Sequence, residues 1–399
     1  MRIYARSHSY TCGVDLHRRT MYLCVLDAEG QIVLHRKLPC RPEAFLAAVE
    51  PYRATLVVGC ECLFSWYWLA DLCQEAGIDF VLGHALGMRL IHGTKTKNDK
   101  LDSEKIARLL HSGHFPLAYV YPRATRATRD LLRRRLYFVR RRADLLTHLQ
   151  IVEAQYNLEP LRARLDRAAN RAGYPERFPT GSARLSIAAD CKMLDALDEL
   201  VGALERQLVR TAKIDDLDSF CRLRTVPGIG EILSMTILYE LPDFDRFDTV
   251  GEFASYGRLV APRGESSGKL GAARGRKQGN VHLKWAFSEA AVTLLRDNPP
   301  AQKLHDRLVR RFGKAKALSV LAHKIGRAVF YMQKRKLPFD AERFYAEGSI
   351  DRGGAPASPS SKSSRGRFES EKVRTRPRAG GRTSPTNAPE TRRSDSPPN

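Results

Sequence analysis

Two carboxylates lie three residues apart in one short segment of the chain. Asp99 and Asp102 belong to the run KNDKLDSEKIARLL, residues 97–110, and at a helix start this spacing puts both on one face. Such a pair can hold a divalent cation against a phosphate, because Mg²⁺ prefers a few carboxylate oxygens together with water and substrate oxygens. Helix capping is the competing explanation, since Asp is a preferred N-cap and the helix dipole favours acids in a first turn. The local spacing leaves both explanations open.

Two further acids stand at the ends of expected strands. Asp15 lies at the end of the first strand, and Glu61 directly follows the fourth. Ligands bind outside the carboxyl ends of the strands in open α/β sheets, so these two acids are expected to converge with residues 99 and 102. A lone Asp at a strand end is more often a turn former. Four acids at one edge together favour a metal site.

The first third of the chain alternates strands and helices, and it must position these acids. Its first three strands are separated by short turn signals and form an antiparallel meander. The fourth, ATLVVGC, is an apolar run typical of a strand buried on both faces. The expected strands are residues 11–16, 21–27, 31–38, 54–60 and 78–82, and the expected helices are 42–52, 64–76 and one after Asp102. This order predicts an α/β domain with a mixed sheet.

Length and charge define the class of protein. The chain has 399 residues and a formal net charge of +23, which suits a multidomain protein with affinity for polyanions, nucleic acid first among them. It has no long uncharged apolar run, and its N-terminus lacks the apolar core of a signal peptide, so we expect no membrane partner and a cytoplasmic, nucleoid-associated protein. The eight cysteines form no paired CxxC motifs and are expected to be reduced core residues.

Residues 123–156 contain neither Gly nor Pro and predict one long helix. One stripe has the four-three spacing of a coiled-coil seam, which is compatible with oligomerisation. The other faces are crowded with arginine, opposed almost only by Asp130, and unpaired guanidinium groups favour phosphate contacts. Residues 188–213 are expected to fold back on this helix as an antiparallel partner. The seam is Leu132, Leu136, Val139, Ala143 and Leu146, and the arginines expected to bind nucleic acid are Arg133, Arg134, Arg140 and Arg141.

A glycine-containing turn lies in LRTVPGIGEILSMTILYEL, residues 223–241. The PGIG sequence between two short apolar helices is typical of a helix-hairpin-helix, in which Gly228 and Gly230 let the backbone approach a phosphate at a helix N-terminus. An ordinary turn between two helices is the alternative.

The run from 260 to 280 is rich in Gly, Ser, Lys and Arg and is expected to form an exposed loop. Within it, Ser266 and Ser267 precede Gly268 and Lys269. A serine beside basic residues can attack a phosphodiester when a base or metal activates it, although Ser-Ser-Gly is also a common linker sequence. Residues 301–336 are expected to be helical again.

The two halves together resemble the DEDD insertion-element transposases, the group that includes the Piv-type DNA invertase. In the first half the resemblance rests on the Asp of the meander, the Glu after the fourth strand and the run ND-x-x-D-S-x-K-I-A-R-L-L. In the second it rests on YGRLV at 256–260, Ser-x-Gly-Lys in the loop, and Gly279-Asn280 followed by HLKWAFSEAA. It spans roughly residues 11–336, and Lys269 replaces a second glycine found in some relatives.

This resemblance implies a RuvC/RNase H-like domain whose acids Asp15, Glu61, Asp99 and Asp102 bind Mg²⁺. It implies that a serine of the loop is the nucleophile that forms a covalent phosphoserine link to DNA; the pattern maps onto Ser266, with Ser267 as the alternative. It also implies a dimer-based synaptic tetramer, and a structured guide RNA that chooses donor and target sites. The Arg-rich helix at 123–156 is then a candidate surface for RNA as well as DNA.

The expected fold class is α/β plus α: a RuvC-like domain at 1–115, a basic helical coiled-coil arm at 116–215, and a mainly helical transposase domain at 216–345. Residues 346–399 have few large apolar residues and are expected to be a disordered basic tail. The expected function is a DNA transposase or site-specific recombinase. The competing functions are a RuvC-like Holliday junction resolvase or endonuclease that uses activated water, and an inactive nucleic-acid-binding protein.

Overall fold

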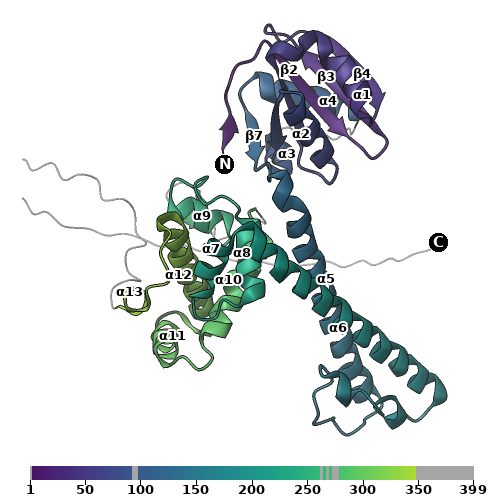
Figure 1. Cartoon of the computed structure of the whole chain (residues 1–399), viewed down its shortest axis with the longest axis vertical. Coiled ribbons are helices and arrows are strands. Elements are labelled where there is room, and N and C mark those ends of the chain that lie inside the picture. Colours follow the sequence, from purple (N-terminus) through teal and green to yellow (C-terminus); the bar gives the residue numbers. More distant parts are fainter. Residues whose placement is uncertain (1, 92–97, 261–263, 267–268, 272–277, 347–399) are drawn as a thin grey trace, which may run out of the picture. The chain divides into compact units, whose positions relative to one another are not determined.

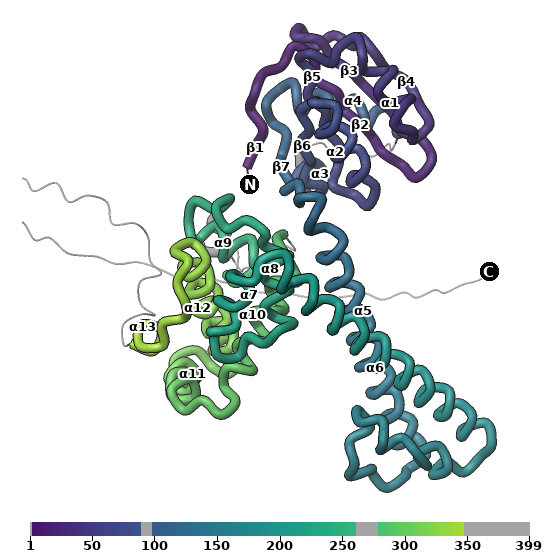
Figure 2. Tube along the Cα trace, in the orientation of Figure 1, coloured from purple at the N-terminus to yellow at the C-terminus, as the bar shows by residue number. Residues whose placement is uncertain are grey.

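The computed structural model describes residues 2–91, 98–260, 264–266, 269–271 and 278–346. The expected basic tail lies almost wholly outside these residues. The N-terminal part is built on a seven-stranded sheet with the order β1-β7-β6-β5-β2-β3-β4 (Figures 1 and 2). Seven strands with both parallel and antiparallel neighbours confirm the expected mixed α/β sheet.

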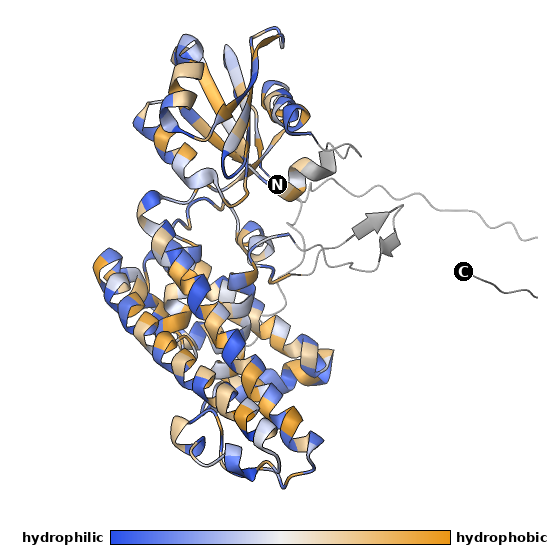
Figure 3. Cartoon of the chain, turned by 90° about the vertical axis from the view of Figure 1, so that its right-hand side faces the viewer, coloured by the Kyte–Doolittle hydropathy of each residue, from blue (hydrophilic) through white to orange (hydrophobic). Residues whose placement is uncertain are grey.

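The predicted meander is present. Strands β2 (Tyr10–Leu16), β3 (Thr20–Leu26) and β4 (Ile32–Pro39) pair antiparallel in sequence order. Strand β5 (Leu56–Glu61) pairs parallel with β2 and with β6 (Asp79–Gly83). Five of the six residues of β5 are buried, as its unbroken apolar run predicts. Figure 3 shows apolar colouring on several strands of this sheet.

Two strands at the β1 side of the sheet were not predicted from the sequence. β7 (Phe115–Ala118) pairs antiparallel with β6, and β1 (Ile3–Tyr4) pairs with β7. The helix after Asp102 therefore does not close the domain. β1 is only two residues long, and Pro116 weakens the strand signal of β7, because proline is confined largely to edge positions in sheets.

The helices of this domain differ from prediction mainly at their ends. The expected helix 42–52 ends earlier and is followed by a 3₁₀ turn, η1. The helix expected after Asp102 already begins at Asp99, and a short helix before it was not predicted. The helices are α1 (Pro42–Val49), η1 (Glu50–Thr55), α2 (Trp66–Glu75), α3 (Ala85–Ile91) and α4 (Asp99–His111).

Gly13 of β2 lets α4 lie directly on the sheet. A Cβ atom at this position would lie 2.2 Å from the carbonyl oxygen of Ser103 and 2.3 Å from the amide nitrogen of Ala107, both in the backbone of α4. Backbone atoms within a helix cannot move aside as a flexible side chain can. The close packing of α4 on β2 thus depends on glycine at position 13.

We expect Gly13→Ala to lower the free energy of unfolding by about 3 kcal/mol or more, since overpacking against rigid atoms commonly costs about 1–3 kcal/mol. Gly181→Ala is the matched control, because a Cβ there meets nothing within 4 Å, and its effect should stay within about 0.5 kcal/mol. Urea unfolding of the two variants measures both values. Equal stability of the two variants would contradict the close approach of α4.

A long helix follows the sheet, as predicted. α5 (Arg123–Gln155) is continuous, and α6 (Gly181–Asp215) lies beside it (Figure 1). Three side-chain contacts join the two helices, and their partners rise in number along α5 while they fall along α6, so the helices are antiparallel. They are the ion pairs of Arg135 with Glu205 and Arg142 with Asp198, and the contact of His148 with Asp190.

The segment between α5 and α6, for which the sequence predicts no clear element, contains two 3₁₀ turns, η2 (Ala168–Asn170) and η3 (Pro175–Arg177). Tyr174 and Phe178 are buried here against Leu149 of α5 and Ile187 of α6. This small core holds the far ends of the two helices together.

The C-terminal part is mainly helical, and its helices share one hydrophobic core. The helix expected at 301–336 is two helices, broken at Gly313, whose φ of +80° favours glycine. The expected loop at 260–280 contains a short antiparallel hairpin. The elements are α7 (Leu217–Arg224), α8 (Glu231–Glu240), α9 (Val250–Tyr256), β8 (Gly264–Ser266), β9 (Lys269–Gly271), α10 (Val281–Leu294), α11 (Pro299–Phe312), α12 (Lys314–Arg335) and α13 (Ala341–Tyr345).

Candidate active site

The register of β2 and β5 brings two of the predicted acids side by side. The strands are parallel, Val14 pairs with Cys60, and Asp15 and Glu61 are the next residue of each strand. Glu61 is the last residue of β5 rather than the residue beyond it, which corrects its expected place. Neighbouring residues of paired strands point to the same face. Asp15 and Glu61 are therefore neighbours at the carboxyl ends of adjacent strands.

That face is the one covered by α4. A Cβ on Gly13 would meet the α4 backbone, and a Cβ on Gly59 would lie 2.6 Å from Cδ1 of Leu110, also in α4. Side chains two positions apart in a strand share a face. Asp15 and Glu61 consequently point to the side of the sheet on which α4 lies.

Asp99 and Asp102 occupy the first turn of α4, and neither caps it. Asn98 is the N-cap, and its Oδ1 accepts a hydrogen bond of 3.0 Å from the amide of Lys100. Neither Asp is therefore the N-cap, although both stand in the first turn, where the helix dipole favours acids. His35 of β4 bonds the Lys100 carbonyl at 2.9 Å, which holds this first turn against the sheet.

Three side chains converge where β2 meets α4. His17 Nε2 lies 3.2 Å from Asp15 Oδ2 and 3.3 Å from Asp99 Oδ1, and the ligand atoms of the three groups all lie within 4.8 Å of one another. His17 was not among the site residues predicted from the sequence. The signal available was its position two residues after Asp15, which places it on the same side at the strand end.

The electrostatics of this cluster suit a divalent cation. Burial raises the pKa of Asp15; the carboxylates of Asp99 and Asp102 raise it further, and His17 acts in the opposite direction. Asp102 also bonds Lys105 at 2.8 Å. A cation would relieve the repulsion between these carboxylates, and clustered carboxylate oxygens are the donors that Mg²⁺ prefers, with the imidazole suited to transition metals as well.

The serine predicted to be the nucleophile is placed only by its backbone. Ser266 is the last residue of β8 and pairs with Lys269, the first residue of β9. Ser267, the alternative nucleophile, lies outside the described residues. The hairpin thus places Ser266 directly opposite a lysine of the neighbouring strand.

The two glycines of the PGIG turn have different surroundings. Gly228 has a φ of +87°, and a Cβ there would lie 2.6 Å from the amide nitrogen of Leu294 in α10. Its carbonyl accepts a hydrogen bond of 2.6 Å from Thr293. Gly230, the N-cap of α8, has nothing within 4 Å of an added Cβ. Gly228 therefore packs against α10, whereas the backbone at Gly230 is open to a ligand.

The arginines of α5 are not left unpaired, contrary to the prediction from the sequence. Acids distant in the sequence neutralise several of them, which local spacing could not reveal. Arg134, Arg140 and Arg141 are exposed, and Arg141 pairs with its close neighbour Asp144 at 3.2 Å. The arginines with distant partners are Arg123 with Asp71 and Glu75, Arg126 with Asp71, Arg129 and Arg133 with Glu240, Arg135 with Glu205, and Arg142 with Asp198.

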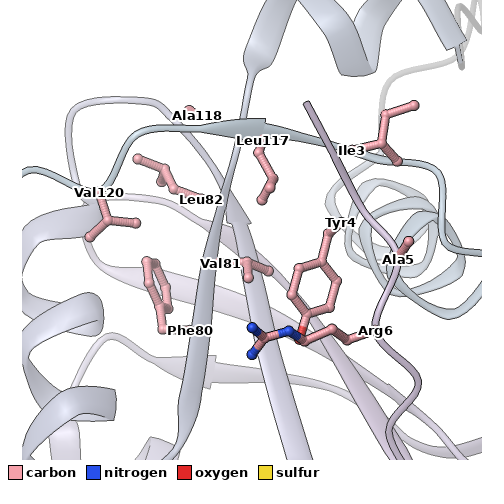
Figure 4. A pocket seen from close by; sticks show the side chains of 10 residues that line it. All are labelled: Ile3, Tyr4, Ala5, Arg6, Phe80, Val81, Leu82, Leu117, Ala118 and Val120. Atoms are coloured by element: carbon pink, nitrogen blue, oxygen red, sulfur yellow. The ribbon is translucent and has the colours of Figure 1, made fainter. Parts of the chain in front are cut away.

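The described part of the sheet domain also contains a mainly apolar cavity of about 560 Å³ (Figure 4). It lies between the chain at Ile3–Arg6, the β6 residues Phe80–Leu82, and Leu117, Ala118 and Val120. None of the four acids lines it. Among the described helices, none is long and apolar enough to cross a membrane.

Comparison with known proteins identifies the family. Residues 12–156 match the sequence model of the DEDD transposases of the IS110 type, and residues 221–306 match that of the transposase IS116/IS110/IS902 family. The chain is also similar to a probable family 20 transposase of Pseudomonas aeruginosa, with 24% identity over 296 residues, which cover 71% of this chain and 83% of that protein. The four acids lie within the first matched region, and the chain is a DEDD transposase of the IS110 family, an enzyme that cuts and rejoins DNA.

Proposed function

We propose that this transposase cuts and rejoins DNA at a metal site formed by Asp15, Glu61, Asp99 and Asp102, with Ser266 as nucleophile. The observation that carries the proposal is the convergence of Asp15, His17 and Asp99 ligand atoms within 4.8 Å beneath α4. The parallel register that places Glu61 beside Asp15 supports it.

The residues of the chain have separate tasks in this reaction. The four carboxylates would hold the cation at the ends of β2 and β5 and the first turn of α4. A bound Mg²⁺ supplies charge stabilisation to the oxygens of an in-line phosphoryl displacement. Ser266 Oγ attacks the phosphorus, the bond from phosphorus to one sugar oxygen breaks, and that oxygen leaves as a hydroxyl carrying the proton lost by the serine. Attack by a new DNA hydroxyl on the phosphoserine reverses these changes and frees the serine.

The arm and the C-terminal domain provide the nucleic-acid surface in this proposal. Arg134, Arg140 and Arg141 are exposed on α5, and a structured guide RNA or DNA is their proposed partner. The α7–α8 turn acts as a helix-hairpin-helix through the open backbone at Gly230, and Lys269 contacts phosphate beside the serine. The sequence predicts that the first domain ends at residue 115, and we propose to extend it to Ala118, where β7 ends.

Ser266 lies far along the chain from the four acids, and this motivates a proposal in which a second copy completes the active site. We propose a dimer or tetramer in which the coiled-coil seam of α5 contributes to contacts between copies. Leu132 and Leu136 of this seam are already buried within the chain, and Leu146 packs against the small core between α5 and α6, so Val139 and Ala143 are the seam residues left for a second copy. A junction resolvase that uses only activated water is not favoured, since both matched regions belong to transposases.

A covalent adduct between protein and DNA tests the serine mechanism. Purified protein is incubated with DNA carrying the ends of its element, with Mg²⁺ and any RNA transcribed from that element. The expected product survives denaturation and protease digestion as a serine-containing peptide attached to a DNA end. Metal-dependent cleavage without such a peptide would instead support hydrolysis by water.

A further inference from the structure

The segment that carries Ser266 leaves and re-enters the helical domain at one point. The amide of Asn280 donates to the carbonyl of Tyr256 at 2.6 Å, and Arg258 Nε donates to the carbonyl of Gly279 at 2.9 Å. Gly279 has a φ of +94°, and a Cβ there would lie 2.5 Å from the Tyr256 carbonyl oxygen. The two ends of the segment are thus in direct contact, and a side chain at 279 would separate them.

Asn280 makes two kinds of contact at this point. Its Oδ1 accepts hydrogen bonds from the amides of His282 (2.9 Å) and Leu283 (3.2 Å) and so caps α10. Its Nδ2 donates to Glu240 Oε2 at 2.7 Å. The first contact is ordinary capping. The second ties the base of the serine segment to the last residue of α8.

Glu240 is in turn held by the arm. It is only 2% exposed, and it accepts from Arg129 Nε at 3.0 Å and from Arg133 Nε at 2.7 Å. Burial alone would raise the pKa of Glu240, but the hydrogen bond and charge of Arg133, with the charge of Arg129, lower it. The carboxylate is therefore ionised, and one buried anion joins α5 to the base of the segment.

A second set of contacts joins the start of α5 to Glu240 and Tyr256. The hydroxyl of Tyr121, just before α5, donates to the Glu240 carbonyl at 3.1 Å and bonds the Tyr256 hydroxyl at 2.9 Å. Arg129 also lies over the Tyr121 ring, 3.7 Å from its centroid. The start of the arm thus contacts both Glu240 and the residue at which the segment departs.

We propose that Glu240 and Asn280 are positioning residues that fix the serine segment relative to the arm. This inference rests on the proposed role of Ser266. The link aligns the serine and is separate from metal binding, which involves the sheet domain.

Asn280→Ser separates the link from the cap. Serine is as good an N-cap as asparagine, but it lacks the amide donor to Glu240. Asn298→Ser is the matched control, because Asn298 Oδ1 caps α11 by accepting from Ala301 and its side chain bonds Tyr345 instead of Glu240. We expect the single-turnover rate of adduct formation to fall about tenfold or more in Asn280→Ser and to be unchanged in Asn298→Ser. DNA affinity should be the same in both.

Hydrogen exchange provides a readout that does not depend on activity. Peptides covering 254–260 and 278–283 should exchange faster in Asn280→Ser than in the parent, while the interior of α10 keeps its protection. Unchanged exchange at both peptides, or faster exchange with an unchanged adduct rate, would overturn the positioning role. If the parent itself forms no adduct, the serine mechanism fails, and unchanged cleavage rate and exchange in Asn280→Ser would then overturn the link separately.

Discussion

Asp15→Asn should lower the rate of DNA strand cleavage on the order of 10³-fold. A metal ion at such a site supplies several kcal/mol of charge stabilisation in the transition state, and each step of about 1.36 kcal/mol is a factor of ten in rate. Asparagine has the shape of aspartate but lacks the charge that holds a cation. Single-turnover cleavage of DNA in Mg²⁺ measures the loss.

Glu104→Gln is the matched control for this substitution. Glu104 lies in the same helix as Asp99 and Asp102, but it pairs with Arg108 one turn along α4, at 2.7 Å. A partly exposed pair of this kind contributes only about 0.3–0.5 kcal/mol to stability, and cleavage should be unaffected. Full activity of Asp15→Asn would contradict the metal site, and with it both the serine mechanism and any metal-dependent hydrolysis.

Without metal, Asp15→Asn should make the folded protein more stable at neutral pH. Burial raises the folded-state pKa of Asp15 above its ordinary value of 3.8. The metal-free folded protein therefore binds the proton of the Asp15 carboxyl group more tightly than the unfolded chain does. Stability contributed by the protonated form is complete below pH 3.8 and is lost as pH rises through the raised pKa. Asparagine does not ionise, so it has no buried charge to destabilise the fold at neutral pH. In EDTA, Asp15→Asn should therefore unfold at a higher temperature than the parent at about pH 7, but not at about pH 4.

Magnesium should reverse the order of the two melting temperatures. A cation that binds only the folded protein stabilises it by about 2.7 kcal/mol at a concentration of about 100 Kd. The parent should therefore gain melting temperature on adding Mg²⁺, whereas Asp15→Asn should gain little. Equal gains in the two proteins would place the cation somewhere other than at Asp15.

The layout of the sheet domain could be predicted because its signals are local. The meander and the buried run of β5 follow from alternation and turn residues, and parallel strands bring their carboxyl ends to one edge. These local signals are enough to place Asp15 and Glu61 together. The cap of α4 is less predictable, since Asn98, Asp99 and Asp102 are all suitable residue types, and only the hydrogen bond from Lys100 identifies Asn98.

The charges within α5 do not reveal which of its arginines are paired, because their partners are distant in the sequence. Arg129 and Arg133 stand unopposed in the sequence of α5, yet Glu240, more than a hundred residues later, binds both. The packing of α8 on α5 determines this contact, and no periodicity within either helix encodes it. The same holds for His17, whose role depends on where α4 places Asp99. Exposed Arg134 and Arg140 stay candidates for nucleic-acid contact because no tertiary ion pair neutralises them in the described part of the chain.

Ser266→Ala should abolish the covalent adduct and strand rejoining. Removing a catalytic nucleophile costs up to about 10⁶-fold in other enzymes. Alanine is compatible with the strand backbone, so the β8–β9 pairing of residue 266 with Lys269 is retained. Ser267→Ala is the control that assigns the nucleophile: it should retain adduct formation, and the reverse result would move the role to Ser267.

The combination of the two catalytic variants separates the candidate mechanisms. If the serine attacks, Ser266→Ala and Asp15→Asn both lose rejoining, but Ser266→Ala should keep its Mg²⁺-dependent gain in melting temperature because its four acids are intact. If water attacks instead, Ser266→Ala keeps cleaving and only Asp15→Asn is inactive. Cleavage and rejoining assayed on the same labelled DNA, with and without Mg²⁺, distinguish these outcomes, because the energy of the broken phosphodiester is conserved for rejoining only when a phosphoserine forms.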